Sequence, residues 1–525
     1  MLAIGMLFGY KMNNLNQSSL ISFVDDDAQG SVGAVEELIR FIETRYVDSI
    51  DREDLTDKAI EAVLADLDPH SVYITPDQIA RVNDEMEGRF RGIGVEIFYL
   101  EDTVNIINTI PDGPASKAGI QSFDKLISIN DSIVAGQGLK FSDIRKMLRG
   151  DIGDELELKL ITSGNKEKIA NIRIDDIPVS SVKGGVMVDD ETGYIKVDRF
   201  GANTYREFMD YIQDLTENHG MKNVIIDLRD NPGGYLPQAT NILSQLFKDK
   251  GNLMVYTQGN SDKKQEYKTT GKSFFRVDKI SVLIDENSAS GSEIMAGAIQ
   301  DWDRGVVIGR RSFGKGLVQE QYDLNNGGAL RLTVARYYTP SGRSIQRTYD
   351  DKENYYSDYE ERYYSGEFFS EDSIAEGNSK LYETMKLKRP VFGGGGITPD
   401  IFIPIDSSRF EPIYGDLINA IPQYVFKALA KRRNTLSKSD ISSYSKQLFI
   451  DYITDNQTKE NESFVNTYSK DIQNKITSSL IKNVEDEKAV FDFELPLDEF
   501  VIKSLEYFNS SNKLTDLIKT TAEEN

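Results

Sequence analysis

Residues 281–319 read SVLIDENSASGSEIMAGAIQDWDRGVVIGRRSFGKGLVQ, and the rest of the chain is organised around them. An apolar strand at residues 282–284 runs into a polar turn, and a helical pattern begins at Ser290. A second apolar strand, at residues 305–308, leads into a glycine-flanked turn that carries Lys315. The succession of strand, helix and strand predicts an α/β core. Ser290 and Lys315 are the candidates for a nucleophile and its base.

Both residues also have an ordinary structural interpretation. The sequence Ser-Gly-Ser-Glu fits a capping box, with Ser290 as N-cap and Glu293 three residues later, and local sequence alone favours that interpretation. Most lysines lie on the surface. A desolvated Lys315 with a lowered pKa could instead take a proton from a serine. The N–H of Gly291, at the start of the helix, would then stabilise an oxyanion.

Composition excludes several other kinds of site. The length of 525 residues predicts several domains. The net charge of −24 argues against nucleic-acid binding. Cysteine is absent, so thiol catalysis and cysteine-ligated metals are excluded. The two histidines, His70 and His219, are too few for most zinc sites and leave little for a Ser-His-Asp triad. Composition thus leaves few side chains for a metal site or for catalysis by cysteine or histidine.

The first 88 residues divide into an apolar start and a helical part. Residues 1–10 are apolar, but ten residues are too few to span a bilayer. We expect them to be the remaining half of a signal anchor, followed by a polar linker to residue 30. Residues 34–67 repeat apolar side chains at helical spacing in two helices. His70, just after the second helix, fits a helix-ending residue better than a site residue.

Residues 89–176 change to strand-like runs around one short helix, at residues 142–149. The segment opens with Gly92-Ile93-Gly94-Val95 and resembles a PDZ domain. In that family such a loop offers backbone N–H groups to the carboxylate of a peptide, which adds as a strand to the edge of the sheet. The resemblance assigns peptide binding to Gly92, Ile93, Gly94 and Val95.

Residues 177–346 alternate strands and helices, which predicts an α/β core. Its predicted strands include residues 192–197, 223–227, 280–284 and 330–338. The sequence DLRDNPGG at 227–234 forms a turn after a strand, and such a turn can aim an N–H into a crevice or can simply connect two elements. The acidic, tyrosine-rich residues 349–372 predict a solvated, weakly ordered surface insertion. The glycine tract at 393–396 is followed by Pro399 instead of a helix, which excludes a phosphate loop.

Several motifs together resemble the carboxyl-terminal processing peptidases, also called tail-specific proteases. They occur in the family's order around the PDZ-like segment, and the resemblance covers roughly residues 34–405. The motifs lie at residues 67–71, 227–234, 287–293, 312–319, 338–346 and 393–400. The implied fold is a multidomain α/β (α+β) protein with a ClpP/crotonase-like protease core. The implied parts are an N-terminal segment (1–30), a helical region (31–88), a PDZ domain (89–176), the serine protease core (177–405) and a helical C-terminal region (406–525).

The resemblance also implies a Ser–Lys dyad. The family's nucleophile corresponds to Ser290, its lysine to Lys315 and its supporting glutamine to Gln319. The oxyanion donors correspond to the N–H groups of Gly291, where the family has alanine, and of Gly233 in the Asn-Pro-Gly-Gly turn. The implied reaction is acyl transfer without a cofactor or metal, on protein substrates recognised by their C-termini.

The resemblance further implies regulation and location. An arginine at the end of the PDZ helix takes part in gating in this family, and Arg149 is its counterpart. The implied location is extracytoplasmic, in the periplasm, with an anchor in the inner membrane. The C-terminal region, 406–525, carries no motif, and three interpretations stay open: a homo-oligomer contact, an adaptor site, or packing on the core.

Two other kinds of protein compete with the peptidase interpretation. One is a PDZ scaffold without catalytic activity, and the presence of Ser290, Lys315 and Gln319 argues against it. The other is a different acyl hydrolase of the Ser-x-x-Lys type, because Ser261 and Lys264 have that spacing. Short matches of this kind arise by chance, and no supporting motif follows the Ser261–Lys264 match.

Overall fold

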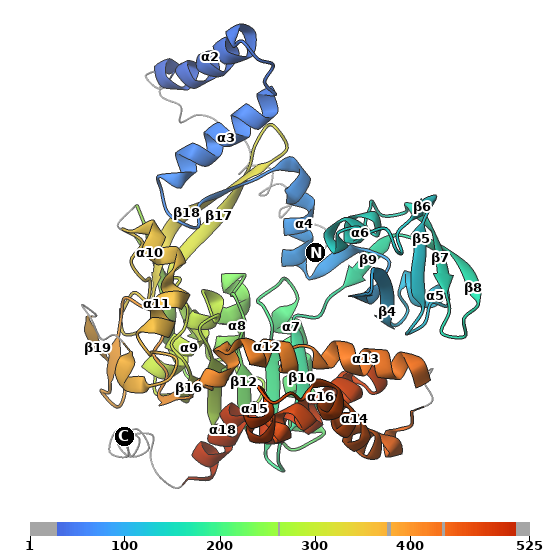
Figure 1. The fold of residues 1–525 in the computed structure, drawn as a ribbon. Helices are drawn as coiled ribbons and strands as arrows, with labels where there is room; N and C mark the ends of the chain where they lie inside the picture. Colours follow the sequence, from blue (N-terminus) through green and yellow to red (C-terminus); the bar gives the residue numbers. More distant parts are fainter. Residues whose placement is uncertain (1–28, 261–262, 375–379, 433–435, 511–525) are drawn as a thin grey trace, which may run out of the picture. The chain divides into compact units, whose positions relative to one another are not determined.

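The computed structural model describes residues 29–260, 263–374, 380–432 and 436–510 (Figure 1). Contacts divide the described residues into a smaller unit, residues 29–79 with 319–333, and a larger unit that holds the other described residues. The predicted apolar start of the chain and half of the Ser261–Lys264 pair lie outside the described residues. In the described part, no helix is long and apolar enough to cross a membrane.

The smaller unit contains two helices and the tip of a β-hairpin. Its helices are α2 (Gln29–Arg45) and α3 (Arg52–Ala65), and Asp51 caps the start of α3 with its carboxylate. The short strand β1 (Val72–Ile74) pairs antiparallel with residues 329–331 of the hairpin. Asp68 accepts hydrogen bonds from the hydroxyls of Ser71 and Thr333, which ties the chain after α3 to the hairpin. The connecting helix α4 (Pro76–Glu87) follows β1.

A six-stranded sheet forms the centre of the larger unit. Its strand order is β10-β11-β12-β15-β16-β21, and every neighbouring pair except β10–β11 is parallel. Buried parallel strands are apolar along their whole length. The strands are β10 (Val182–Met187), β11 (Thr192–Val197), β12 (Asn223–Asp227), β15 (Ile280–Ile284), β16 (Val306–Gly309) and β21 (Ile401–Phe402).

Helices cover both faces of this sheet because successive side chains of a strand point to opposite faces. Val282 and Ile284 of β15 join one buried cluster with apolar side chains of three helices, α7 (Thr204–Glu217), α8 (Leu236–Leu246) and α9 (Gly291–Asp301). Leu283 joins the opposite cluster with Phe500 and Val501 of α18 (Glu499–Asn509). The last part of the C-terminal region therefore packs on the core. Packing on the core was one of the three interpretations left open for residues 406–525.

A second sheet borders the core and continues into the hairpin. Strand β13 (Lys250–Gly259) pairs antiparallel with β14 (Lys264–Thr270) and with residues 335–338 of β18 (Ala329–Tyr338). Strand β17 (Leu317–Asp323) pairs with β18. The hairpin of β17 and β18 thus begins directly after Lys315.

Residues 89–178 form a separate β-domain with its own buried apolar cluster. Its sheet order is β3-β4-β5-β7-β8, with β6 paired to β5, so β3 is an edge strand. A two-stranded ladder of β2 and β9 closes the domain at its start and end. The elements are β2 (Arg89–Gly92), β3 (Val95–Leu100), β4 (Thr103–Thr109), α5 (Pro114–Lys117), β5 (Lys125–Ile129), β6 (Ser132–Ile133), α6 (Phe141–Met147), β7 (Glu155–Ile161), β8 (Glu167–Arg173) and β9 (Asp175–Pro178).

The prediction of a weakly ordered loop at 349–372 is wrong. This insertion folds into α10 (Lys352–Tyr356), α11 (Asp358–Tyr364) and the 3-10 turn η2 (Glu371–Ser373). It buries Arg362 and Glu367, which are only 3% and 4% exposed. Arg362 and Glu367 can be buried because they bond to residues 311 and 312 of a distant loop. The charged sequence of the insertion gave no sign of this burial.

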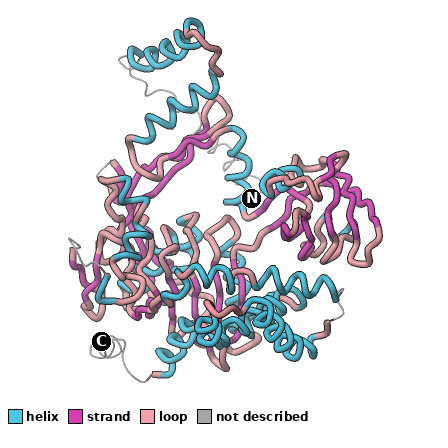
Figure 2. The backbone as a smooth tube through the Cα atoms, viewed as in Figure 1, coloured by secondary structure: helices cyan, strands magenta, loops and turns pink. Residues whose placement is uncertain are grey.

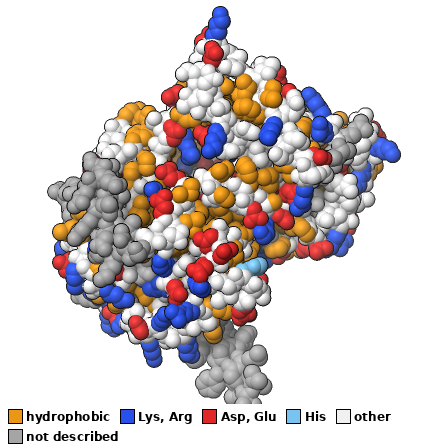
Figure 3. All heavy atoms as spheres, turned by 90° about the horizontal axis from the view of Figure 1, so that it is seen from below, with side chains coloured by type: hydrophobic (Ala, Val, Ile, Leu, Met, Phe, Trp, Pro, Cys, Tyr) orange, Lys and Arg blue, Asp and Glu red, His pale blue; other side chains and the backbone are white. Residues whose placement is uncertain are grey.

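Helices make up the described C-terminal region, as Figure 2 shows. Besides α18, the region contains α12 (Pro412–Ile418), α13 (Ile421–Arg432), α14 (Ile441–Asn456), α15 (Glu462–Thr467), α16 (Ser469–Val484) and α17 (Glu487–Glu494). Helices α13, α14 and α16 share a buried cluster with Leu100 and Phe123 of the β-domain. The ring of Phe426 on α13 lies 5.1 Å from that of Phe123. Acidic and basic side chains are intermixed on the face drawn in Figure 3.

Candidate active site

Three loops meet at one edge of the central sheet. They follow the carboxyl ends of the adjacent parallel strands β12, β15 and β16. The first carries Asn231 and Gly233, the second carries Ser290, and the third carries Lys315. The carboxyl edge is the usual place for sites in open parallel sheets, because the loops there converge.

Ser290 has a strained backbone. Its φ is 54° and its ψ is −110°, outside the left-handed helical region that non-glycine residues sometimes adopt. The residue lies between β15 and the first residue of α9, at the sharp turn from strand to helix. Such strain costs about 1–3 kcal/mol and concentrates at functional sites.

Glu293 ties the serine turn to the lysine loop. Its carboxylate is fully buried, and Oε2 accepts hydrogen bonds from the backbone N–H groups of Ser290 (2.8 Å) and Lys315 (2.9 Å). Oε1 accepts from the N–H of Gly314 (2.7 Å) and the hydroxyl of Ser312 (2.6 Å). One carboxylate oxygen is thus shared by both candidate catalytic residues. Glu293 does bond the Ser290 N–H as a capping residue would, but its other three donors all come from the lysine loop.

The buried carboxyl group of Glu293 titrates near neutral pH. Burial raises the pKa of Glu293 to about 7, whereas the four hydrogen bonds favour the charged form and limit the rise. Only the ionised carboxylate offers acceptors to all four donors, because protonation converts one oxygen into a donor. The ionised form therefore holds the site in the arrangement described.

Tyr337 joins the same two residues from the opposite side. Its hydroxyl donates to the carbonyl oxygens of Lys315 (2.5 Å) and Ser290 (3.1 Å), and its side chain is only 1% exposed. Burial raises the pKa of Tyr337 well above its ordinary value, so the phenol stays a donor. Sequence reasoning missed this residue. The only signal was its place at the end of a predicted strand, next to the motif at 338–346.

The predicted oxyanion donors lie beside the serine. A Cβ atom on Gly233 would come within 2.6 Å of the Cβ of Ser290 and 2.9 Å of the nitrogen of Gly291. Only glycine allows this approach, and Gly233 also has a φ of +96°. Its N–H donates to Oδ1 of Asn231 at 2.8 Å. The turn must therefore release this N–H before Gly233 can serve an oxyanion.

The insertion at 349–372 holds the lysine loop. Arg362 donates to the carbonyl oxygens of Arg311 and Ser312, both at 2.9 Å. Arg311 makes a two-pronged ion pair with Glu367, at 2.7 Å for each contact. Desolvation lowers the pKa of Arg362 to about 10, which still leaves it charged at neutral pH. Arg362 is a second residue that sequence reasoning missed.

Gln319 lies on β17, in the smaller unit. Its amide nitrogen donates to the carbonyl oxygen of His70 at 2.6 Å. The predicted hydrogen bond from Gln319 to the amine of Lys315 stays a prediction. In the part of the chain that is described, no group of three or more histidine, aspartate or glutamate side chains is placed to hold a metal ion.

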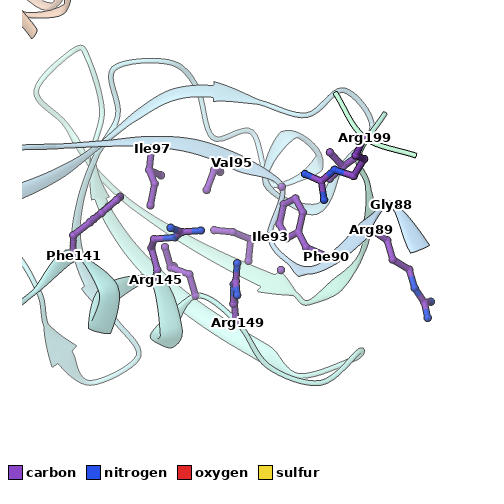
Figure 4. A pocket seen from close by; sticks show the side chains of 14 residues that line it. Gly88, Arg89, Phe90, Ile93, Val95, Ile97, Phe141, Arg145, Arg149 and Arg199 are labelled. Atoms are coloured by element: carbon purple, nitrogen blue, oxygen red, sulfur yellow. The ribbon is translucent and has the colours of Figure 1, made fainter. Parts of the chain in front are cut away.

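The β-domain has a groove between the edge strand β3 and helix α6, with a volume of about 430 Å³ (Figure 4). Residues 92–95 line one end of it, together with Leu148 and Arg149. The carbonyl groups of Ile93 and Gly94 accept hydrogen bonds from inside the domain, at 2.9 Å each. Their N–H groups donate to no acceptor among the described residues. The predicted loop residues and Arg149 therefore meet in one groove.

Comparison with known proteins supports the peptidase interpretation. Residues 191–352 match the description of peptidase family S41. The carboxy-terminal processing protease CtpB of Bacillus subtilis is 31% identical over 328 residues, which are 62% of this chain and 67% of the relative. A carboxy-terminal-processing protease of Bartonella bacilliformis is 35% identical over 310 residues, 58% of this chain and 70% of the relative.

One solved structure among the similar ones is a photosystem II D1 C-terminal processing protease. It is 28% identical, with a TM-score of 0.34, over 59% of this chain and 83% of that one. The two curated relatives exceed 30% identity and are each covered over two thirds of their length or more. The chain therefore belongs to the carboxy-terminal processing proteases of peptidase family S41, and it is a serine protease.

Proposed function

We propose that the chain cleaves proteins at or near their C-termini by a Ser290–Lys315 dyad, after its β-domain has bound the substrate C-terminus as a PDZ domain does. One observation carries the catalytic part. The strained turn at Ser290 has its N–H and its carbonyl oxygen bonded to the same two buried groups, Glu293 and Tyr337, as the N–H and carbonyl oxygen of Lys315. A serine and a lysine fixed to each other in this way suit proton transfer between their side chains.

The proposed reaction is acyl transfer. The neutral amine of Lys315 accepts the proton of the Ser290 hydroxyl as Oγ attacks the peptide carbonyl carbon. The N–H groups of Gly291 and Gly233 stabilise the oxyanion, once Gly233 has left Asn231. Lys315 then gives its proton to the leaving amine. A water molecule, deprotonated by Lys315, releases the acyl group and restores the serine.

The groove of the β-domain supports the second part of the proposal. Strand β3 pairs only with β4 within its sheet, so its other edge can accept an extended peptide. The N–H groups of Ile93 and Gly94 lie at the end of that edge, where a terminal carboxylate would accept their hydrogen bonds. Apolar side chains of the groove would take the terminal side chain. The extracytoplasmic location stays a prediction.

Variants test the dyad directly. A peptide with an apolar C-terminus should be cleaved by the unmodified chain, and Ser290→Ala and Lys315→Ala should each lower kcat at least about 10³-fold. Lys222→Ala is a matched control, because Lys222 is exposed and pairs with Glu191 away from the site. Full cleavage by both dyad variants would show that the assignment is wrong. No cleavage of any peptide by the unmodified chain would favour a scaffold without catalytic activity.

A further inference from the structure

Two arginines face the groove of the β-domain from the side of helix α6. Arg145 lies within the helix, and Arg149 follows its end. Figure 4 shows the guanidinium of Arg145 between the end of the groove marked by Phe141 and Ile97 and the end marked by Ile93. Arg149 lies at the latter end, beside the loop of residues 92–95.

The charges of these arginines have no carboxylate partner in the part of the chain that is described. Two arginines on neighbouring strand β2 differ in this respect, because Arg89 pairs with Asp176 at 2.8 Å and Arg91 with Asp151 at 3.4 Å. Arg145 only approaches the ring of Phe141, at 6.0 Å. An unpaired basic pair in the groove of a chain with net charge −24 fits an acidic ligand.

The spacing of the arginines matches the spacing of an added strand. Arg149 lies two residues beyond the end of α6, but the chain continues there as a turn, because the N–H of Arg149 donates to the carbonyl oxygen of Lys146 at 3.1 Å. Arg145 and Arg149 are thus about one helical turn apart, roughly 6 Å along the axis. Alternate residues of an extended peptide point to the same side and lie about 6.8 Å apart. A peptide on β3 with its terminal carboxylate at Ile93 and Gly94 would therefore place the side chain of its third-last residue opposite Arg145.

We propose that Arg145 selects an acidic side chain at the third-last position of the peptide that the groove binds. The inference rests on the proposed PDZ function and adds the class of ligand: a C-terminus with an apolar last residue and an aspartate or glutamate two residues before it. Leu148 and Ile93, both buried in the β-domain, form the apolar wall near the carboxylate loop. Arg149 is left to face the terminal carboxylate.

Peptide binding by the full chain tests this inference. The Ser290→Ala variant prevents cleavage, and fluorescence anisotropy measures binding of two labelled peptides that differ only in aspartate or asparagine at the third-last position. We expect the aspartate peptide to bind about fivefold more tightly at low salt, and less so at high salt. Arg145→Gln should abolish this difference. Arg145 is exposed, so the change should not disturb folding.

Lys146→Gln is the matched control. It removes the same charge from the adjacent position of α6, where the side chain is 81% exposed and does not line the groove. It should keep the aspartate preference. Equal binding of both peptides by the parent, or a preference that survives Arg145→Gln, would overturn the inference while leaving the PDZ proposal in place. The PDZ proposal itself would be overturned if no peptide with a free C-terminus bound, or if the same peptide bound equally well with its C-terminus amidated.

Discussion

At the residue scale, the site depends on backbone positions that are costly to maintain. Ser290 carries a φ of 54° immediately before a helix, and Gly233 approaches it so closely that a side chain would collide. Glu293 and Tyr337 each hold the serine and the lysine at once, by their backbone groups. The backbones of Ser290 and Lys315 are therefore held in place by the surrounding chain before any substrate arrives.

The strain at Ser290 predicts an unusual order of stability. Ser290→Gly and Ser290→Ala should both abolish cleavage, but the glycine variant should be more stable by about 1 kcal/mol. Glycine accepts the backbone conformation without strain, which outweighs its greater freedom in the unfolded chain. Urea denaturation of the two variants measures the difference. A glycine variant less stable than the alanine variant would mean that the turn is not strained.

Glu293 predicts a pH dependence of stability. Its pKa in the folded chain is about 7, above the ordinary 4.5, so between these values the folded state binds more protons than the unfolded state. The raised pKa stabilises the folded state by about 3 kcal/mol. This stabilisation is complete below about pH 4.5 and is lost as the pH rises through 7. Asp285, with a pKa raised to about 6, acts in the same direction at lower pH.

Denaturation of the unmodified chain and of Glu293→Gln between pH 5 and 8 separates the two carboxyls. In the Glu293→Gln variant, the free energy of unfolding should lose most of its dependence on pH between pH 6 and 8. The variant should also be less stable and less active at pH 8, because its amide NH₂ would face N–H donors. An unchanged slope in the variant would assign the titration to another group.

At the scale of elements, the helical insertion at 349–372 acts as a support for the lysine loop. Its composition predicted a solvated loop, because charged residues are rarely buried without partners. Arg362 pairs locally with Asp358 at 2.9 Å, but it also donates to the carbonyl oxygens of Arg311 and Ser312, about 50 residues earlier. No local pattern shows these two distant acceptors. The hydroxyl of Ser312 then bonds Glu293, so the support reaches the site.

Replacing Arg362 should therefore affect catalysis as well as stability. Lysine keeps the charge but cannot donate to both carbonyl oxygens in the same geometry. Arg362→Lys should lower kcat about tenfold with little change in KM, because a small displacement of a catalytic group is costly. Steady-state kinetics measures both constants.

Arg304 offers a matched control for this prediction. It also donates to backbone carbonyl oxygens, those of Leu246, Val277 and Asp278, away from the lysine loop. Arg304→Lys should reduce stability by about 1–2 kcal/mol without changing kcat. Equal loss of kcat in both variants would mean that the effect on activity is merely one of stability.

Other elements followed directly from the sequence. The predicted strands at 192–197, 223–227 and 280–284 coincide with β11, β12 and β15, because strands buried on both faces are apolar without interruption. The Ser290 helix was predicted within one residue of α9. The bond from the Ser290 N–H to Glu293 was predicted as part of the capping box. The contacts of Glu293 with the lysine loop, and those of Tyr337, could not be predicted, because they join two loops that only the folded sheet brings together.

At the scale of the whole molecule, the C-terminal region connects parts that the sequence left unrelated. Helices α13, α14 and α16 pack on the β-domain, and α18 packs on the central sheet. Arg229, which follows β12, binds both Asp227 and Asp498, so the carboxyl edge of the sheet is also tied to the start of α18. The sequence showed helices in this region but gave no sign of which surfaces they cover.

This packing predicts how the β-domain is held. The ring of Phe426 stacks on that of Phe123 and lies 5.6 Å from that of Phe98. Phe426→Ala should therefore weaken the packing of α13 on the β-domain by about 3 kcal/mol. Hydrogen exchange should become faster in α13 and in β3, while the central strands keep their protection. Unchanged exchange in both elements would mean that this contact does not hold the β-domain.

The central claim is that Ser290 forms a covalent acyl intermediate with Lys315 as its base. Rapid acid quenching during turnover of a peptide substrate, followed by mass spectrometric mapping of the chain, tests it most directly. A Ser290–Lys315 dyad predicts an acyl group on Ser290 that disappears in Ser290→Ala and accumulates far more slowly in Lys315→Ala. An acyl group on any other residue, or undiminished turnover by Ser290→Ala, would contradict it.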